Sequence, residues 1–149
     1  MSTLPGPPQA TDASALLPML HAIQDELGYV PAARVPAIAA ALNISRAEVH
    51  GVLTYYPHFR AHAPGRHVVQ VCRAEACQAC GGNELLDHVE RRLGCRAGQT
   101  RADGAVTVEA VYCLGLCASS PAIQVDDRLH ARVDAARFDR IAAALESTR

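Results

Sequence analysis

Two pairs of cysteines, each directly after an apolar run, constrain this chain more than any other feature of its sequence. The first pair, Cys72 and Cys77, has four residues between its members and follows a valine-containing run. The second pair, Cys113 and Cys117, has three residues between its members and also follows such a run. Alternating apolar runs of this kind predict β-strands. The fold must therefore deliver two thiol-bearing loops, far apart in sequence, from the ends of two strands.

Four thiolates from two loops match the requirements of a [2Fe–2S] cluster, in which each iron takes two cysteines besides the bridging sulfides. The spacing differs from the plant-type ferredoxin pattern, which packs three ligands close together. Gly115 lies between the second pair, where a small residue lets the backbone approach a cluster and direct N–H groups at its sulfurs. We predict Cys72, Cys77, Cys113 and Cys117 as the metal and cofactor ligands.

Other interpretations of the cysteines remain open. Structural zinc also takes four cysteines, and Cys77-Gln-Ala-Cys80 has the spacing of a zinc knuckle, so Cys77, Cys80 and the second pair form an alternative site. Cys77 and Cys80 also fit a thiol–disulfide pair between a strand and a helix. Four buried cysteines acting as small hydrophobes are a third possibility. Cys95, beside Arg91 and Arg92, is predicted to be a free surface thiol.

Composition narrows the class of protein. Half of the 149 residues are hydrophobic and 19% are charged, which is typical of a globular chain. The 14 cations, all arginine, nearly balance 15 acidic residues, and no block of like charge indicates a nucleic-acid or membrane partner. Residues 1–13 lack a signal pattern, and no apolar run approaches the roughly 18 residues of a membrane span. We expect a soluble, cytoplasmic protein, in which six cysteines favour metal binding or redox chemistry over disulfides.

The first part of the chain reads as a flexible tail, 1–13, followed by a helical unit, 14–60. Apolar residues at helical spacing predict three helices there, with Asp12 or Ser14 capping the first and Ser45 and Glu48 forming a capping box at the third. The turn before Ser45 resembles a helix-turn-helix, but the next helix offers only Arg46 as a cation and lacks the basic face that DNA binding requires.

The second part begins after a Pro- and Gly-containing boundary at residues 61–66. Residues 67–149 read as strand, helix, strand, a strand hairpin with its returning strand at 129–133, and a last helix capped by Asp134. Both cysteine pairs follow strands in this order. The sequence therefore predicts an α/β (α+β) chain, with a three-helix unit before a domain that carries the thiols.

The cysteine pattern also resembles a known family. Cys72-x4-Cys77, Cys113-Leu-Gly-x-Cys117 and the following Pro121 are similar to the thioredoxin-like [2Fe–2S] subunits of NADH dehydrogenases and related complexes. The first half adds three matching motifs: Gly28-Tyr-Val-Pro31, Val49-His-Gly-Val52 and Thr54-Tyr-Tyr56. The resemblance covers about residues 15–145 and implies a thioredoxin-like ferredoxin fold for the second domain.

Within this family the chain looks most like the gamma subunit of soluble NAD-dependent, molybdenum-containing formate dehydrogenase. Three stretches carry that likeness: Cys72-Arg-Ala-Glu-Ala-Cys77-Gln, Ala118-Ser-Ser-Pro-Ala122 and Asp127-Arg-Leu-His-Ala-Arg132. NADH dehydrogenase subunits more often carry Asn-Ala in place of Ser119-Ser120. Cys80 and Cys95 are not part of the family's ligand pattern.

The resemblance implies a hetero-oligomer in which different subunits hold different cofactors. This chain would hold one [2Fe–2S] cluster and exchange single electrons with FMN in a partner subunit that binds NAD. A molybdenum-cofactor subunit with further Fe–S clusters would oxidise formate. The alternatives are the equivalent subunit of respiratory NADH dehydrogenase or of a bidirectional NAD-linked hydrogenase. The sequence has no Gly-rich dinucleotide fingerprint and no P-loop, so we predict no catalytic residue in this chain.

Overall fold

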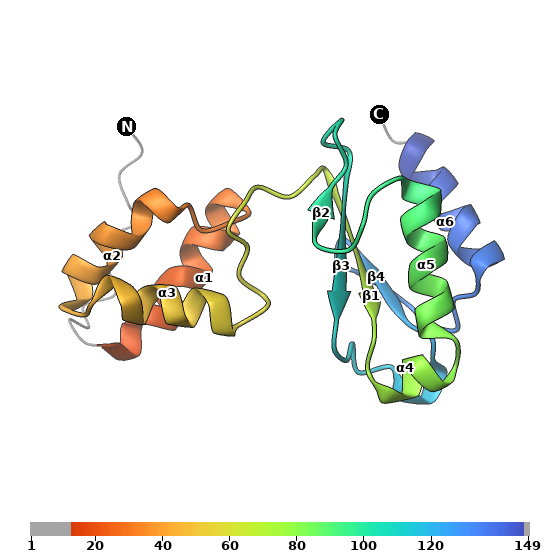
Figure 1. The fold of residues 1–149 in the computed structure, drawn as a ribbon, viewed down its shortest axis with the longest axis horizontal. Coiled ribbons are helices and arrows are strands. Elements are labelled where there is room, and N and C mark those ends of the chain that lie inside the picture. Colours follow the sequence, from red (N-terminus) through yellow and green to blue (C-terminus); the bar gives the residue numbers. More distant parts are fainter. Residues whose placement is uncertain (1–12, 148–149) are drawn as a thin grey trace. The chain divides into compact units, whose positions relative to one another are not determined.

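The computed structural model describes residues 13–147 and divides the chain into two compact units, Met1–Ala63 and Pro64–Arg149 (Figure 1). The predicted tail, 1–13, lies outside the described residues except for Ala13. This division does not show that either unit folds independently, so the predicted domains, 14–60 and 67–149, stay a prediction. Within residues 13–147, no helix combines the length and the apolar character needed to cross a bilayer.

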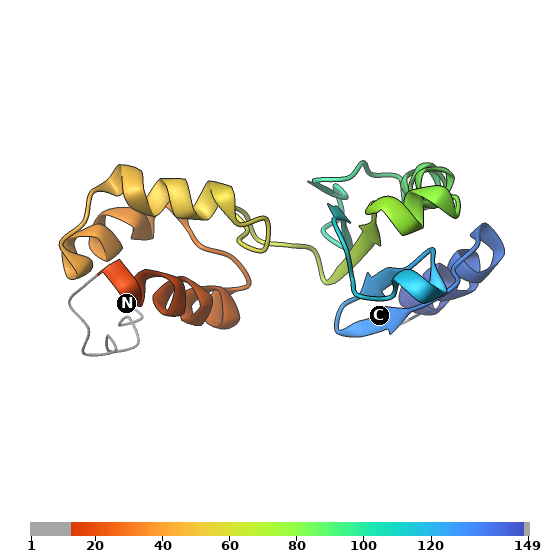
Figure 2. The ribbon, with the colours of Figure 1, turned by 90° about the horizontal axis from the view of Figure 1, so that it is seen from below.

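Three helices form the first unit, and Figure 2 shows them packed against one another. They are α1 (Leu16–Leu27), α2 (Val35–Leu42) and α3 (Arg46–Tyr55), with short 3-10 helices at Ala13–Ala15 and Ala32–Arg34. Their apolar faces form one core, whose fully buried members include Leu20, Ile23, Val30, Ile38, Leu42 and Val49. The helical spacing in the sequence is thus confirmed, because the residues that set it are those that the core buries.

The ends of these helices follow from local backbone chemistry. Gly28 ends α1 at φ 80° and Asn43 ends α2 at φ 52°, both in the left-handed region. The predicted capping box opens α3: the Glu48 N–H donates to Ser45 Oγ at 3.2 Å, and the Ser45 N–H donates to Glu48 Oε2 at 2.8 Å. The predicted cap of α1 is wrong for Ser14, because the N-cap position is Ala15 and makes no side-chain cap bond. The alternative cap, Asp12, lies outside the described residues.

A buried glutamine ties the segment after α3 to α1. Gln24 Nε2 donates to the His58 carbonyl at 2.7 Å, and Gln24 Oε1 accepts the Arg60 N–H at 2.8 Å. The Val30 N–H donates to the Arg60 carbonyl at 2.8 Å. The buried amide thus satisfies backbone groups that would otherwise be unpaired, which is how a polar side chain is tolerated inside a core.

The second unit is a mixed five-stranded sheet with helices. Its elements are β1 (His67–Cys72), α4 (Glu75–Ala79), α5 (Gly82–Leu93), β2 (Gln99–Thr100), β3 (Val106–Val111), a 3-10 helix (Cys117–Ser119), β4 (Ile123–Val125), β5 (Arg128–His130) and α6 (Ala135–Ser147). The strand order is β2-β3-β1-β4-β5. The α+β class is confirmed, while α4 and β2 were not predicted and β5 ends before the predicted 129–133.

The direction of the central strands decides where the thiols lie. β1 and β3 are parallel, with Cys72 opposite Val111, whereas the other neighbouring strands are antiparallel. The carboxyl ends of β1 and β3 therefore meet at one edge of the sheet. Cys72 ends β1, and Cys113 follows the end of β3 by two residues.

One face of the sheet is covered by α5 and α6, which lie together in Figure 1. Their apolar sides join those of the strands in one core, which includes Val69, Val71, Val89, Val108, Ile123 and Phe138. The predicted cap of α6 is confirmed, because Asp134 Oδ1 accepts the Arg137 N–H at 2.7 Å. This packing makes the sheet a rigid base for the loops at its edge.

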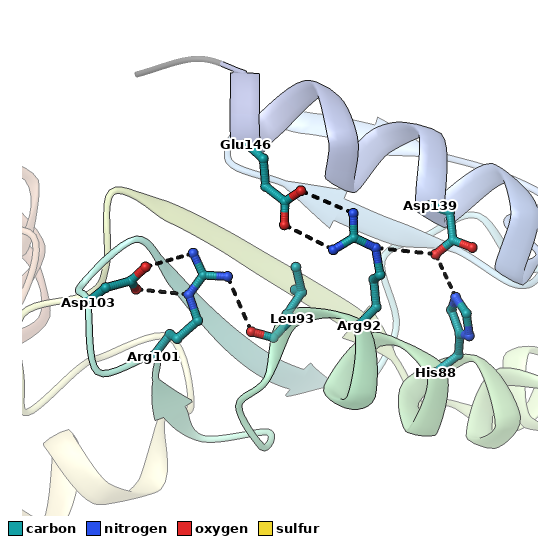
Figure 3. Close-up of polar contacts among 7 residues, drawn as sticks. All are labelled: His88, Arg92, Leu93, Arg101, Asp103, Asp139 and Glu146. Atoms are coloured by element: carbon teal, nitrogen blue, oxygen red, sulfur yellow. Dashed lines mark hydrogen bonds and ion pairs between the residues drawn. The ribbon is translucent and has the colours of Figure 1, made fainter.

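Charged side chains join α5 to α6, as Figure 3 shows. Arg92 donates two hydrogen bonds to the Glu146 carboxylate, at 2.9 and 3.1 Å. Asp139 Oδ1 lies 2.8 Å from His88 Nε2 and 3.8 Å from Arg92 Nε. These groups are partly exposed, so their ion pairs contribute little to the stability of the fold.

A second pair in Figure 3 closes the turn before β3. Arg101 donates two hydrogen bonds to the Asp103 carboxylate, both at 2.8 Å. The Arg101 guanidinium and then the Ala105 N–H lower the pKa of Asp103 to about 2. The ionised carboxylate therefore contributes stability above its unfolded-state pKa of about 3.9, and that contribution is lost as the pH falls through about 2.

We expect Asp103→Asn to reduce the free energy of unfolding at neutral pH and to flatten its pH dependence between about pH 4 and pH 2. Urea titrations across that range would measure this effect. Asp127→Asn is the matched control, because Asp127 lies in an exposed turn and makes no hydrogen bond or ion pair within residues 13–147. If the free energy of unfolding of wild type and of Asp103→Asn depended equally on pH, the lowered pKa of Asp103 would be contradicted.

Candidate functional site

All four predicted cysteines lie at the edge of the sheet where β1 and β3 end. Cys72 is the last residue of β1, Cys77 lies on the short helix α4, and Cys117 begins a 3-10 helix. Cys72 and Cys77 are buried, whereas Cys113 and Cys117 are exposed. None of the six cysteines forms a disulfide. The site therefore has an inner and an outer pair of free thiols.

The outer pair has the spacing of two ligands on one metal atom. Cys113 Sγ and Cys117 Sγ are 3.7 Å apart. With metal–sulfur bonds of about 2.3 Å, a tetrahedral angle places two sulfurs about 3.8 Å apart. The turn between them is tight: Gly115 lies at φ 79°, and its N–H donates to Cys113 Sγ at 3.4 Å. Gly115 thus directs an N–H at a cysteine sulfur, while its role toward a cluster stays a prediction.

The inner pair lies in a small apolar cluster separate from the main core. Cys72, Cys77 and Ala122 form a small buried cluster, against which Ala74, Leu114 and Leu116 pack. The Cys72 N–H donates to the Ala122 carbonyl at 3.1 Å, which joins β1 to the chain that returns from the outer pair. The inner sulfurs are thus shielded from water, and the backbone around them is hydrogen-bonded.

The local electrostatics favour an anionic sulfur at the buried end of the site. Burial raises the pKa of the Cys72 thiol, but hydrogen bonds lower it by more, so the pKa lies below its usual value. Those bonds come from the Ala74 backbone N–H, then from the Cys77 thiol when its one proton is directed at Cys72 instead of Ser120, and then from the backbone N–H groups of Leu114 and Cys113. A thiolate is the form that binds metal, so this environment suits a ligand.

The fourth thiol resists ionisation beside the other three. The hydrogen bond with Cys113 raises the pKa of Cys117, followed by the negative charge of Cys113, slight burial, and the charges of Cys77 and Cys72. The Cys117 sulfur therefore interacts with the other three. Four thiolates so close together need a cationic centre to offset their repulsion, which is the role of the metal in such sites.

The donor set fits a two-metal cluster, in which each iron takes one pair of cysteines. The inner and outer pairs come from separate loops, as that arrangement requires. Among residues 13–147, no three His, Cys, Asp or Glu side chains converge on a position for a single ion.

Two further residues position the inner pair, and the sequence did not reveal either. The Cys77 thiol donates to Ser120 Oγ at 3.5 Å, and the Ser120 hydroxyl donates to the Cys117 carbonyl at 2.9 Å. A Cβ atom at Gly82 would lie 2.7 Å from the Cys77 carbonyl oxygen, so α5 begins directly against the backbone of the site. The sequence indicates only a break between elements at Gly82, because its steric role depends on tertiary contact.

The other two cysteines lie outside this group. Cys80 ends α4 and is exposed. Cys95 is half-buried against the main core, and burial raises the pKa of its thiol, so the prediction of a surface thiol is wrong in its exposure. Neither residue is among the groups that shift the pKa of Cys72 or Cys117.

Comparison with known proteins shows the family to which this chain belongs. Residues 6–146 match the thioredoxin-like [2Fe-2S] ferredoxin family. The chain belongs to that family. Its relatives include an NADH-quinone oxidoreductase subunit of Rhizobium meliloti (strain 1021), 40% identical over 91% of this chain and 79% of the relative. The corresponding proteins of Pseudomonas aeruginosa and Thermus thermophilus are 36% identical over 90% and 79%, and 33% identical over 95% and 78%.

Solved structures share the fold of this thioredoxin-like ferredoxin. One is the crystal structure of an NAD+-reducing [NiFe]-hydrogenase in the H2-reduced state, with a TM-score of 0.76 and 24% identity. The match covers 93% of this chain but 23% of the hydrogenase chain. At that identity the likeness demonstrates a common fold.

The tight outer turn leads to a test at Gly115. We expect Gly115→Ala to lower the free energy of unfolding by roughly 1–2 kcal/mol, because a Cβ atom is unfavourable at a left-handed φ. Gly115→Asn should cost less, since asparagine adopts this region more readily. Urea unfolding of the full chain, followed by circular dichroism, would measure both. Unchanged stability in Gly115→Ala would contradict the backbone geometry of the turn.

Proposed function

We propose that this chain holds one [2Fe–2S] cluster through Cys72, Cys77, Cys113 and Cys117 and serves as an electron-transfer subunit of an NAD-linked oxidoreductase complex. The observation that carries the proposal is the meeting of two thiol pairs at one sheet edge, in a chain of the thioredoxin-like [2Fe-2S] ferredoxin family. The outer pair would bind one iron and the inner pair the other.

The chain's own residues supply the environment that such a group needs. A [2Fe–2S] cluster, when bound, gains or loses one electron at a time. The backbone N–H groups of Ala74 and Leu114 hold negative charge at Cys72. Ala122 and its apolar neighbours keep water from the inner sulfurs. The outer sulfurs stay at the surface, where a partner's redox centre could approach within electron-transfer distance.

We assign the two-electron chemistry to partner subunits. NAD reacts by hydride transfer, so a flavin such as FMN is needed to connect it to carriers of single electrons. The names of the relatives, which are NADH-quinone oxidoreductase subunits, support an NAD-linked complex. On this proposal the chain performs no substrate chemistry and is a non-catalytic component of an oxidoreductase.

Two complexes suit this subunit, and each has a specific observation in its favour. The relatives at 33–40% identity favour an NADH dehydrogenase. Ser119-Ser120, which carries part of the sequence's resemblance to the gamma subunit, favours a molybdenum-containing formate dehydrogenase. An NAD-linked hydrogenase would use the same chemistry.

Affinity purification of the tagged chain from its native cells would distinguish these complexes. A formate dehydrogenase assembly should contain molybdenum and reduce NAD with formate. An NADH dehydrogenase should copurify with membrane subunits and reduce quinone with NADH. We expect the formate-dependent activity. Quinone reduction without molybdenum would overturn the assignment to a formate dehydrogenase, but it would not affect the assignment of the cluster.

Single cysteine substitutions test the ligand set. We expect Cys72→Ser, Cys77→Ser, Cys113→Ser and Cys117→Ser each to lose the cluster or alter its visible and electron paramagnetic resonance (EPR) spectra strongly. Serine is a harder and more basic ligand than a thiolate. Cys80→Ser and Cys95→Ser are matched controls and should keep the wild-type spectra. A wild-type spectrum in Cys77→Ser, with loss in Cys80→Ser, would replace Cys77 by Cys80 in the ligand set.

A further inference from the structure

Ser120 joins the two thiol-bearing loops through a single hydroxyl group. Its oxygen accepts a hydrogen bond from the Cys77 thiol at 3.5 Å. Its proton is donated to the Cys117 carbonyl at 2.9 Å. A serine hydroxyl has one proton to donate and two lone pairs to accept with. Both hydrogen bonds are therefore compatible only while the sulfur of Cys77 carries a proton.

Metal binding removes that proton, because the thiolate is the ligand form. Two acceptors, Cys77 Sγ and the Cys117 carbonyl oxygen, then compete for the one proton of Ser120. Hydrogen bonds to an ionised acceptor are roughly twice as strong as those between neutral groups. Rotation of the hydroxyl toward Cys77 is thus favoured once the sulfur is negative.

We propose that Ser120 donates a hydrogen bond to the sulfur of Cys77 in the cluster-bound protein and so raises the reduction potential of the site. This inference rests on the proposed function, in which Cys77 is a ligand. Addition of one electron increases the negative charge on the cluster and its sulfurs. A donor at the sulfur stabilises that extra charge, and hydrogen bonds to sulfur are among the features that set cluster potentials.

The surroundings of Ser120 strengthen this effect. Cys77 is buried, and with Cys72 and Ala122 it forms the apolar cluster of the inner pair. A hydrogen bond to a negative group is stronger in such surroundings than in water. Ser120 is a positioning residue here: it touches a ligand sulfur and acts through it.

Ser119 provides a matched comparison one residue away. Within the described part of the chain its hydrogen bonds are made by the backbone alone: its N–H donates to the Leu116 carbonyl and its carbonyl accepts the Arg132 N–H, both at 2.8 Å. Removal of the Ser119 hydroxyl should therefore leave the sulfurs unaffected.

Redox titration of the purified full chain, followed by EPR, tests the proposal. We expect Ser120→Ala to shift the potential to a more negative value, with iron and sulfide content retained, and Ser119→Ala to match wild type. Ser120→Thr and Ser120→Val form a second comparison of nearly equal shape. Ser120→Thr keeps the hydroxyl, so its reduction potential should be higher than that of Ser120→Val, which lacks it.

Equal potentials for the Thr and Val variants, or for Ser120→Ala and wild type, would overturn the inference. The Thr and Val comparison also keeps it testable if Ser120→Ala holds no cluster. A wild-type chain without iron would instead defeat the proposed function, so the two failures are distinguishable.

Discussion

The parallel pairing of β1 with β3 is the constraint on which the site depends. Because Cys72 lies opposite Val111, both strands end at the same edge, and the loops that follow them start side by side. An antiparallel pair would send the loop after β3 to the opposite end of the sheet. The antiparallel strand β4 then returns the chain, so that Ala122 hydrogen-bonds to Cys72 and closes the inner side of the site.

Packing around this edge gives the two pairs different surroundings. The inner sulfurs lie in apolar contact, and the Cys72 sulfur accepts hydrogen bonds from backbone N–H groups. The outer sulfurs lie on an exposed turn that Gly115 makes possible. Gly82 allows α5 to begin against the Cys77 carbonyl, where a side chain would collide. The main core, in which Phe138 is fully buried, holds the sheet in place and contributes no donor atom to the site.

The sequence predicted those features that local patterns determine. The capping box at Ser45 and the cap at Asp134 both depend on near neighbours. The strands before each cysteine pair are also predictable, because their alternation of apolar residues is strong.

Features made by distant contacts were missed. Helix α4 is only five residues long, too short for a periodic signal, and β2 has only two residues. The roles of Ser120, Gly82 and Gln24 arise from groups that are far away in sequence or are brought close by a turn. The polar neighbours of Cys95 indicate a surface position, yet its side chain is partly buried against the core.

A single analysis of the wild-type chain tests whether its four thiols hold a two-iron cluster. Iron, acid-labile sulfide and zinc should be measured in the chain purified without air, together with its EPR spectrum after reduction. We predict about two irons and two sulfides per chain and a paramagnetic signal that appears on one-electron reduction. One zinc per chain with neither iron nor sulfide would contradict the cluster assignment.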